Sequence, residues 1–449
     1  MRSPSYYKQK IDALAQIPVY ADDIKILLSA KDFRLTLLDS IKAATKRIYL
    51  PTLYLQDDEA GKEIMGALYA AKQRNPRLDI KLFVDFHRAQ RTLIGQKGKG
   101  GNTLLYQEMK NQYSVQIDVY GIPVKTREIF GVLHLKGFVF DHELLYSGAS
   151  LNDVYLHQKD QYRYDRYFMI KNKFLADTMI DFLNQYFVNN SAPQPLDRQH
   201  LLSARELKLT IRRFRKELRK ASYQFDGSSL QDEQVGITPI SGFGRQKNQL
   251  NLTIHHLIRS TEKQLVLLTP YFNLPQKVAK GIKSLLKRDV KVIIVVGDKS
   301  ANDFFIPADQ PFKRIGGLPY IYEQNLRKFM REHQASIDKG LLSIRLWKDG
   351  NHTYHLKGIY SDDCYRMITG HNLNPRAWRL DFENALLIHD HGNLLRQKVE
   401  RELKQIYKNT DEVLSYQNIQ KLKDYPAKVQ GLLAKLKKVK ADFLIKRIT

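Results

Sequence analysis

Two copies of one short pattern hold the residues of this chain that are best suited to chemistry. Each copy reads H-x-K-x4-D, and the six residues are His134, Lys136, Asp141, His355, Lys357 and Asp362. Side chains two positions apart on a strand share a face, so each copy sets an imidazole beside an ammonium group. A neutral imidazole can attack phosphorus, and a protonated one can donate a proton to the leaving oxygen. The duplication therefore predicts a two-histidine phosphate-transfer site in which lysines stabilise the phosphoryl oxygens and no metal is needed.

The neighbourhood of each copy is duplicated as well. Each is followed by an apolar run and then by glycine and small polar residues, which are Gly148, Ser150, Asn152, Thr369, Gly370, Asn372 and Asn374. These hydroxyls and amides could donate neutral hydrogen bonds to a phosphoryl group. Further acids, Asp165 and Glu383, stand ahead of another apolar run in each half, and we expect them to hold the catalytic lysines or histidines. The aspartates that end the two copies are expected to orient the imidazoles through their second ring nitrogen.

Other interpretations of the pattern stay open from the residues alone. A histidine beside a lysine on one strand is more often a solvated edge, although a second copy with matching neighbours argues against this. Phosphate binding without turnover would use the lysines and asparagines but would not need both histidines. A metal site is disfavoured, because two lysines near the carboxylates would repel a divalent cation.

Composition indicates the class of partner. The chain has 449 residues, a net charge of +26 and a pI near 9.7, so we expect polyanionic partners, either anionic lipid or nucleic acid. A single cysteine, Cys364, excludes an internal disulfide and fits a reducing cytosol. The amino terminus has no apolar signal core, and the longest apolar runs are too short to span a bilayer. We therefore expect a soluble or peripherally membrane-bound protein.

The elements that must position the two copies follow the same order twice. Helical and strand spacing predicts helix 34–46, strand 47–55, helix 61–74 and strand 78–86, and then helix 250–259, strand 264–272, helix 275–287 and strand 290–296. This order predicts an α/β protein of two similar halves, each a mixed sheet flanked by helices, with the site at the seam between them. The expected domains are 1–200, a basic linker helix and polar loop at 201–245, a second half at 246–400 and a basic amphipathic tail at 401–449.

The linker and the tail are both basic. Residues 201–220 hold eight basic and two acidic residues, with Leu207, Ile211, Phe214 and Leu218 at helical spacing. A solvated linking helix and a phosphate or lipid contact both fit this segment. The tail 425–449 has an apolar helical stripe and seven basic residues against one aspartate, and it is expected to lie on an anionic membrane surface. The proposed membrane-contacting residues are Lys428, Lys435, Lys437, Lys438 and Lys440.

The two motifs, each followed by glycine, small polar residues and asparagine, resemble the signature of the phospholipase D superfamily. Longer segments narrow the resemblance: YSGASLNDVYLHQKDQYRYDRY, TPYFNLP, VGDKSANDFFIP and ITGHNLNPRAWRLDFENALLIHD are similar to the bacterial type I phosphatidylserine synthase family, nearly end to end. The resemblance implies that a phosphatidyl group passes from CDP-diacylglycerol to L-serine, with release of CMP and a phosphatidyl-histidine intermediate, without a metal or other cofactor. It also implies a cytoplasmic protein at the inner face of the cytoplasmic membrane.

The same resemblance assigns roles to residues. His134 becomes the nucleophile and His355 the general acid, with the motif lysines and the asparagines at 152 and 374 around the phosphoryl group. The supporting carboxylate is implied to come from the opposite half, so Asp362 would serve His134 and Asp141 would serve His355. The usual G-S-x-N is shifted by one residue around Ser150, and asparagine stands where serine is common in the second copy.

Substrate contacts rest on position near the expected site. Arg88 and Arg91 follow a strand end, Arg376 follows the second motif, and Tyr271 lies in TPYFNLP. Asp298, Lys299 and Asp303 follow a strand end in the second half and are expected at the mouth of the site. For any one arginine, an ion pair that stabilises the fold is the plainer explanation.

Rival functions come from the same superfamily and from the charge. Phospholipase D or cardiolipin synthase would differ only in the acceptor, and a phosphodiester nuclease would suit a basic chain. The sequence lacks the interleaved basic and aromatic residues of a recognised nucleic-acid module, which argues against the nuclease. A polyanion-binding protein without turnover is a third possibility. Because both motifs lie in one chain, a dimer is not needed to complete the site, and the oligomeric state is left open.

Overall fold

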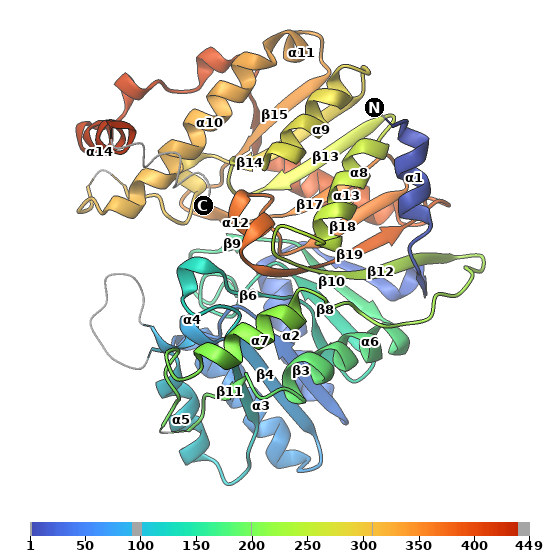
Figure 1. The fold of residues 1–449 in the computed structure, drawn as a ribbon, viewed down its shortest axis with the longest axis vertical. Coiled ribbons are helices and arrows are strands. Elements are labelled where there is room, and N and C mark those ends of the chain that lie inside the picture. The colour runs from blue at the N-terminus through green and yellow to red at the C-terminus, as the bar shows by residue number, and fades with distance from the viewer. Residues whose placement is uncertain (1, 92–100, 199, 308, 439–449) are drawn as a thin grey trace.

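Two large sheets, one in each half, organise the protein (Figure 1). The computed structural model describes residues 2–91, 101–198, 200–307 and 309–438. In spatial order the first sheet contains β11 (Gln194–Pro195), β5 (Asp118–Ile122), β4 (Asp79–Asp85), β3 (Arg47–Pro51), β7 (Phe138–Phe140), β8 (Glu143–Ser147), β10 (Tyr167–Lys171) and β2 (Ile24–Leu27). The second contains β1 (Ile17–Tyr20), β12 (Gln234–Phe243), β19 (Phe382–His389), β18 (Tyr365–Thr369), β17 (Gly358–Ser361), β13 (Gln264–Thr269), β14 (Lys291–Gly297), β15 (Leu342–Trp347) and β20 (Thr410–Glu412).

The central six strands of each sheet share one topology. In the first half β3, β4 and β5 are parallel, and β7, β8 and β10 continue antiparallel from β3. In the second half β13, β14 and β15 are parallel, and β17, β18 and β19 continue antiparallel from β13. The duplication seen in the sequence is therefore a duplication of fold, and the expected mixed sheets in two similar halves are confirmed.

Helices cover both sheets. They are α1 (Pro4–Asp12), α2 (Ala30–Ala43), α3 (Glu59–Arg74), α4 (Phe86–Gln90), α5 (Thr103–Gln112), α6 (Lys173–Leu183), α7 (Lys208–Leu218), α8 (Gln249–Ser260), α9 (Gln276–Leu286), α10 (Leu318–Glu332), α11 (Gln334–Asp338), α12 (Pro375–Arg379), α13 (Arg396–Lys408) and α14 (Ala427–Lys438). The eight elements expected from periodicity are all present, with ends that differ by a few residues. Side-chain caps define several starts, because Ser29, Asp58 and Asn248 accept backbone N–H bonds at α2, α3 and α8.

Three segments lie elsewhere than the expected boundaries place them. β1 pairs with β12 and α1 lies beside α8, so residues 2–20 belong to the second half (Figure 1). β12, inside the expected linker loop, is a buried strand that pairs along its length with β19. The expected boundary at residue 400 falls inside α13, which buries Val399 and Ile406, and farther along β20 pairs with β15. The partners of these segments are distant in sequence, so local composition gave little sign of them.

The linker helix is α7, and its apolar face is buried as expected. Leu207, Ile211, Phe214 and Leu218 are each at most 4% exposed, while the arginines between them face outward or lie at the edge of the packed face. The helix therefore packs on the body and keeps its charge at the surface.

The tail helix α14 uses its apolar stripe inside the protein. Val429 and Leu433 pack with Tyr320, Ile321 and Tyr425 in a small cluster at the start of α10. The stripe that predicted membrane contact thus has a protein partner over 427–438, and the basic side chains on the helix are exposed: Lys428, Lys435, Lys437 and Lys438. Lys440 lies outside the described residues. Over the described ranges, none of the helices has the length and apolar character needed to cross a membrane.

Candidate active site

Each motif histidine is held by a strand exchanged between the halves. His134 ends β6 (Leu133–His134), which belongs to the first half but pairs in parallel with β19, and the register sets His134 opposite Glu383. His355 follows β16 (Thr353–Tyr354), which pairs in parallel with β9 (Arg163–Tyr164), and its N–H donates to the Tyr164 carbonyl at 2.8 Å. The two motifs therefore meet at the seam, as expected.

The carboxylate beside each histidine comes from the opposite half. His134 Nδ1 lies 2.8 Å from Glu383 Oε2, and His355 Nδ1 lies 3.0 Å from Asp165 Oδ2. The Tyr155 hydroxyl lies 2.9 Å from His355 Nδ1 as well. Both histidines are 6% exposed, so these contacts are almost completely shielded from water. Carboxylates at Nδ1 fix the ring orientation and leave Nε2 as the nitrogen that can meet a substrate.

The aspartates that end the two motifs do not reach the histidines, which corrects the expected role of both. Asp141 and Asp362 sit at the β7–β8 and β17–β18 turns with φ of 50°, a left-handed conformation that aspartate tolerates. Asp141 accepts from the N–H groups of residues 45–47 at 2.8–3.0 Å, and Asp362 accepts from those of residues 262–264 at 2.7–3.1 Å. Each therefore anchors the start of a parallel strand, β3 or β13, to its hairpin. Each histidine does receive its carboxylate from the opposite half, but the acids are Glu383 for His134 and Asp165 for His355.

The two motif lysines converge on one loop. Lys136 Nζ donates to the Ala149 carbonyl at 3.0 Å, and Lys357 Nζ donates to Asp165 Oδ2 at 2.9 Å and contacts His355 Nδ1. A Cβ added at Gly148, next to Ala149, would lie 3.0 Å from Lys357 Nζ. Both ammonium groups thus flank the turn at 148–149, and each lysine is 1% exposed.

The glycine of each tight turn makes room for the opposite motif. A Cβ at Gly148 would lie 2.8 Å from Asp165 Oδ1, and a Cβ at Gly370 would lie 2.9 Å from Lys136 Cγ and 3.4 Å from His134 Cε1. Glycine is needed at Gly370 because the second half approaches the first motif there without space for a side chain. The glycines noticed in the sequence are therefore part of the seam.

Burial and like charge set the electrostatics. Burial, reinforced by the nearby lysine charges, holds the pKa of His134 well below its usual value and lowers the pKa of His355 to about 3. Burial and the charge of Lys357 lower the pKa of Lys136 to about 7. The substrate-free site therefore contains neutral imidazoles and a Lys136 side chain that is only partly protonated near pH 7, and an incoming phosphate anion would stabilise its ammonium form.

The pKa values of the two carboxyl groups shift in opposite directions, although both groups are buried at the seam. Burial raises the pKa of Glu383 to about 7. Burial acts in the same direction on Asp165, but the Lys357 charge and the His355 hydrogen bond prevail and lower its pKa to about 2. An ionised Asp165 can stabilise an imidazolium at His355, whereas the partly protonated Glu383 supports a neutral His134.

The small polar residues near the motifs differ in whether their side-chain oxygens are hydrogen-bonded within the protein. Asn152 Oδ1 accepts from Tyr155 N at 3.0 Å, and Asn374 Oδ1 accepts from Ala377 N at 2.9 Å, where it caps α12. Because each amide oxygen is held by the backbone, the NH₂ groups are oriented and can donate to a ligand. Ser150 is buried, and Asn372 Oδ1 is buried with no partner among the described residues.

The expected substrate contacts divide into two groups. The Tyr271 ring lies edge-on to His355 at 6.1 Å, and its hydroxyl donates to Asp303 at 2.7 Å. The arginines are engaged within the fold. Arg88 lies over the Tyr54 ring at 4.5 Å, Arg91 pairs with Glu128, and Arg376 pairs with Asp381 at 3.1 Å. Of these arginines, Arg376 is near enough to His134 for its charge to contribute to lowering that histidine's pKa.

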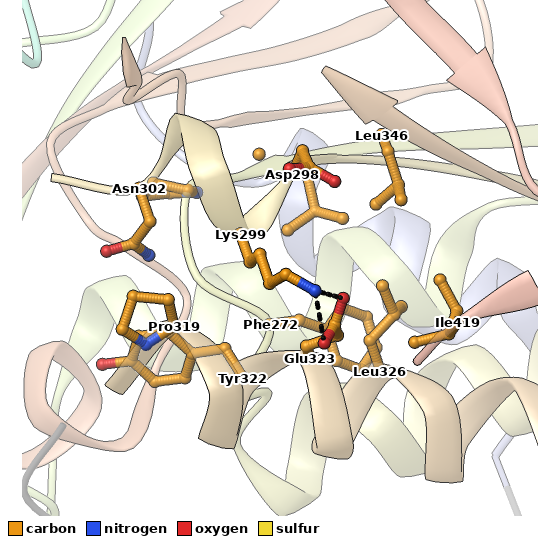
Figure 2. A pocket seen from close by; sticks show the side chains of 13 residues that line it. Phe272, Asp298, Lys299, Asn302, Pro319, Tyr322, Glu323, Leu326, Leu346 and Ile419 are labelled. Carbon is orange, nitrogen blue, oxygen red and sulfur yellow. Dashed lines mark hydrogen bonds and ion pairs between the residues drawn. The ribbon is translucent and has the colours of Figure 1, made fainter. Parts of the chain in front are cut away.

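A pocket lies just past the end of β13, and the two sequence neighbours of Tyr271 line it (Figure 2). Its lining includes Pro270, Phe272, Asn302 and Lys299. The Lys299 ammonium lies 3.0 Å from Glu323, so the charge expected at the mouth of the site is paired there.

Several residues in contact with the motifs were missed. Tyr155 lies within the block after the first motif, and its phenol could have been noticed as a polar group there. The Arg166–Glu402 pair, with 2.7 Å between Nε and Oε1, lies directly behind Asp165, and Arg166 N donates to Asp165 Oδ1 at 2.9 Å. His371 follows the second tight turn; burial lowers its pKa to about 4, and the charges of Glu383 and His134 also act on it. Glu402 lies far along the chain on α13, and no local signal points to it.

Comparison with known proteins agrees with this arrangement. The family model described as "Cardiolipin synthase, PLD-like domain" matches residues 254–407. The chain is 47% identical to the CDP-diacylglycerol–serine O-phosphatidyltransferase PssA of Escherichia coli strain K12, and the match covers 98% of each chain. It is 45% identical to the CDP-diacylglycerol–serine O-phosphatidyltransferase of Haemophilus influenzae, with 98% of each covered.

A solved structure matches over the full length. The crystal structure of phosphatidylserine synthase from Haemophilus influenzae Rd KW20 superposes with a TM-score of 0.97 at 44% identity and covers 100% of both chains. Identity at this level over the whole chain, together with two phospholipase D-like halves, is more than a shared fold. The chain belongs to the CDP-diacylglycerol–serine O-phosphatidyltransferase family, within the phospholipase D superfamily.

Proposed function

We propose that this protein transfers a phosphatidyl group from CDP-diacylglycerol to L-serine and forms phosphatidylserine and CMP. The crossed pairing of His134 with Glu383 and of His355 with Asp165 is the observation that carries the proposal. It supplies two oriented imidazoles, and the two motif lysines stand beside them. The full-length similarity to enzymes named for this reaction supports the choice of substrates.

In the first step, His134 Nε2 attacks the phosphorus that carries the diacylglycerol. A P–N bond forms and the P–O bond to CMP breaks. His355, which takes up a proton from solvent when the substrate phosphates bind beside it, gives that proton to the departing phosphate oxygen. Lys136 and Lys357, with the NH₂ groups of Asn152 and Asn374, stabilise the charge on the nonbridging oxygens. Burial of the site makes these charge interactions stronger than they would be in water.

In the second step, serine completes the transfer. The neutral His355 takes the proton of the serine hydroxyl, whose oxygen attacks phosphorus, and the P–N bond to His134 breaks. His355 is suited to the acid and base role because the ionised Asp165 stabilises its imidazolium. His134, beside a carboxyl that shares its proton near neutral pH, is suited to attack as a neutral base. Acid, base and nucleophile are then all side chains of this protein.

The acceptor distinguishes this proposal from its rivals. Because the matching family model is described as a cardiolipin synthase domain, transfer to a glycerol-containing headgroup is the alternative within the same site. We further propose that the basic protein works at the cytoplasmic face of an anionic membrane, where its lipid substrate resides. Binding of other polyanions would then be non-specific and sensitive to salt.

The test is a turnover assay with CDP-diacylglycerol in mixed micelles, with and without L-serine, and with EDTA present. We expect serine-dependent CMP release with phosphatidylserine as the lipid product. Phosphatidic acid formed regardless of serine would indicate a hydrolase, and a glycerol-dependent product would indicate the alternative acceptor. Absence of CMP release under all conditions would reject transfer from CDP-diacylglycerol.

A further inference from the structure

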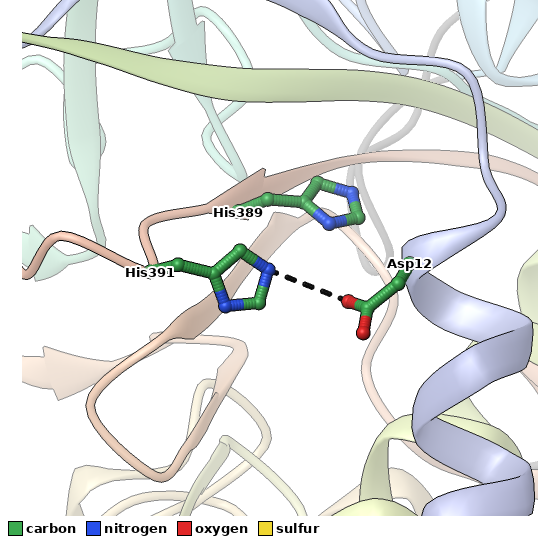
Figure 3. A group of neighbouring side chains, drawn as sticks. All are labelled: Asp12, His389 and His391. Atoms are coloured by element: carbon green, nitrogen blue, oxygen red, sulfur yellow. Dashed lines mark ion pairs between the residues drawn. The ribbon is translucent and has the colours of Figure 1, made fainter. Parts of the chain in front are cut away.

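A second cluster of ligand-type side chains lies away from the active site. Asp12 ends α1, His389 ends β19, and His391 follows in the next loop (Figure 3). One ligand atom from each lies within 4.8 Å of the other two. Glu383 is six residues earlier on β19, which places the cluster roughly 20 Å from the catalytic seam. The proposed reaction uses none of these residues.

Hydrogen bonds fix the form of the His389 ring. Thr238 Oγ1 donates its only proton to the Ala15 carbonyl at 2.7 Å, so it can only accept from His389 Nε2 at 3.1 Å. Nε2 therefore carries a hydrogen, and Nδ1 is the ring nitrogen that can offer a lone pair to a cation. His389 is 0% exposed, and its Nδ1 has no partner among the described residues. A buried lone pair without a donor is uncommon, and a bound water or a cation could be its partner.

The other two groups face that lone pair. Figure 3 shows a nitrogen of the His389 ring turned toward Asp12, with His391 on the other side. His391 Nε2 lies 3.4 Å from Asp12 Oδ1, and the Tyr365 hydroxyl donates to the same oxygen. The Tyr365 ring is edge-on to both imidazoles, at 5.7 and 5.3 Å. Asp12 and His391 are partly exposed, so a solute can reach the cluster from one side.

We propose that His389 Nδ1, His391 Nε2 and the Asp12 carboxylate bind a divalent transition cation of the Zn²⁺ class. Two imidazoles and one carboxylate, with a solvent molecule as fourth ligand, form a donor set typical of tetrahedral zinc. Metal–ligand bonds of about 2.0–2.2 Å need the donor atoms closer than they now are, and the exposed side chains can make that small movement. Thr238 would be the outer partner that fixes the ligating tautomer, as in other histidine metal sites. The cation would tie α1 to the end of β19.

The experiment uses the full-length protein without a polyhistidine tag, dialysed against EDTA and then freed of it. Zn²⁺ is titrated calorimetrically, and Co²⁺ is titrated with detection of visible absorbance. We expect one saturable equivalent, a tetrahedral cobalt spectrum and a higher melting temperature with metal. His391→Ala and Asp12→Asn should abolish or severely weaken binding. Thr238→Val, which keeps all three ligands, should weaken it about 10–100-fold.

A matched control separates this site from other histidines. His200→Ala removes an exposed histidine of the first half and should leave binding unchanged. Equal binding by wild type and His391→Ala, or the absence of saturable binding in a wild type shown to be folded by circular dichroism, would overturn the proposal. Turnover measured below the melting temperature should not depend on the metal, so the proposed transferase activity and this site can fail independently.

Discussion

The sharpest expectation concerns Glu383→Gln, which should make the protein more stable and less active. Glu383 is 1% exposed, and its other oxygen, Oε1, has no partner among the described residues. Burial raises its pKa from 4.5 to about 7. A carboxyl with a raised folded-state pKa stabilises the fold only while protonated, and that contribution is lost as the pH rises from about 4.5 through about 7. Near pH 8 the ionised carboxylate therefore opposes folding.

The size of the effect follows from that shift. At 1.36 kcal/mol per pKa unit, the penalty near pH 8 is about 3 kcal/mol. Glutamine resembles the protonated side chain, so Glu383→Gln should raise the free energy of unfolding by up to that amount near pH 8 and by little near pH 4.5. Its amide cannot hold the His134 ring as the carboxylate does. We expect kcat to fall about 10²–10⁴-fold, in line with the loss of an orienting carboxylate in other triads.

Asp141→Asn is the matched control, because it alters an acid of the motif itself. Its carboxylate accepts N–H bonds from residues 45–47 and touches neither histidine. We expect a stability loss of about 1–2 kcal/mol with turnover nearly unchanged. The assays are urea unfolding at two pH values and CMP release at saturating substrate. If Glu383→Gln kept wild-type turnover, or Asp141→Asn abolished turnover in a folded protein, the crossed-carboxylate reasoning would be refuted.

The remaining expectations concern the nucleophile, pH and the membrane. His134→Ala and His355→Ala should each remove nearly all turnover, and rapid quenching with labelled lipid should trap a protein adduct only where His134 is present; an adduct in His134→Ala would exclude it as nucleophile. Because the pKa of Lys136 is about 7, kcat/KM should decline above about pH 7 as the ammonium is lost, and a flat profile up to about pH 9 would contradict this. Replacing the three lysines in the last turn of α14 by glutamine should weaken sedimentation with anionic vesicles by about 1 kcal/mol each at low salt, with neutral vesicles as the control; unchanged binding would reject the basic face.

Sequence periodicity gave the local elements because their apolar spacing is intrinsic to each segment. α3 and β4, for example, bury residues at helical and strand spacing, and both were expected within a few residues of their ends. β12 was missed because it lies within a segment that begins with a long polar run. Its role depends on β1 and β19, which are distant in sequence.

The sequence predicted most of the residues of the site, but it did not predict which of them contact one another. The histidines, the lysines, Asp165 and Glu383 were all identified from the duplicated pattern. The roles of Asp141 and Asp362 were not, because strand exchange decides which carboxylate meets which ring. The β6–β19 register, which sets His134 opposite Glu383, depends on the pairing of two strands that are far apart in sequence. A pattern within one segment cannot contain it.

Strand exchange has a consequence for how the halves depend on each other. Asp165 is held from behind by Arg166, whose guanidinium lies between Glu402 of α13 and the Tyr360 hydroxyl at 2.8 Å. Tyr360 also donates to Glu402 at 2.5 Å, so all three are partners in one buried network. Such a network is stable only when every member is satisfied. The carboxylate at His355 is therefore positioned by a helix of the second half although it belongs to the first, so the first half would not hold Asp165 in this place on its own.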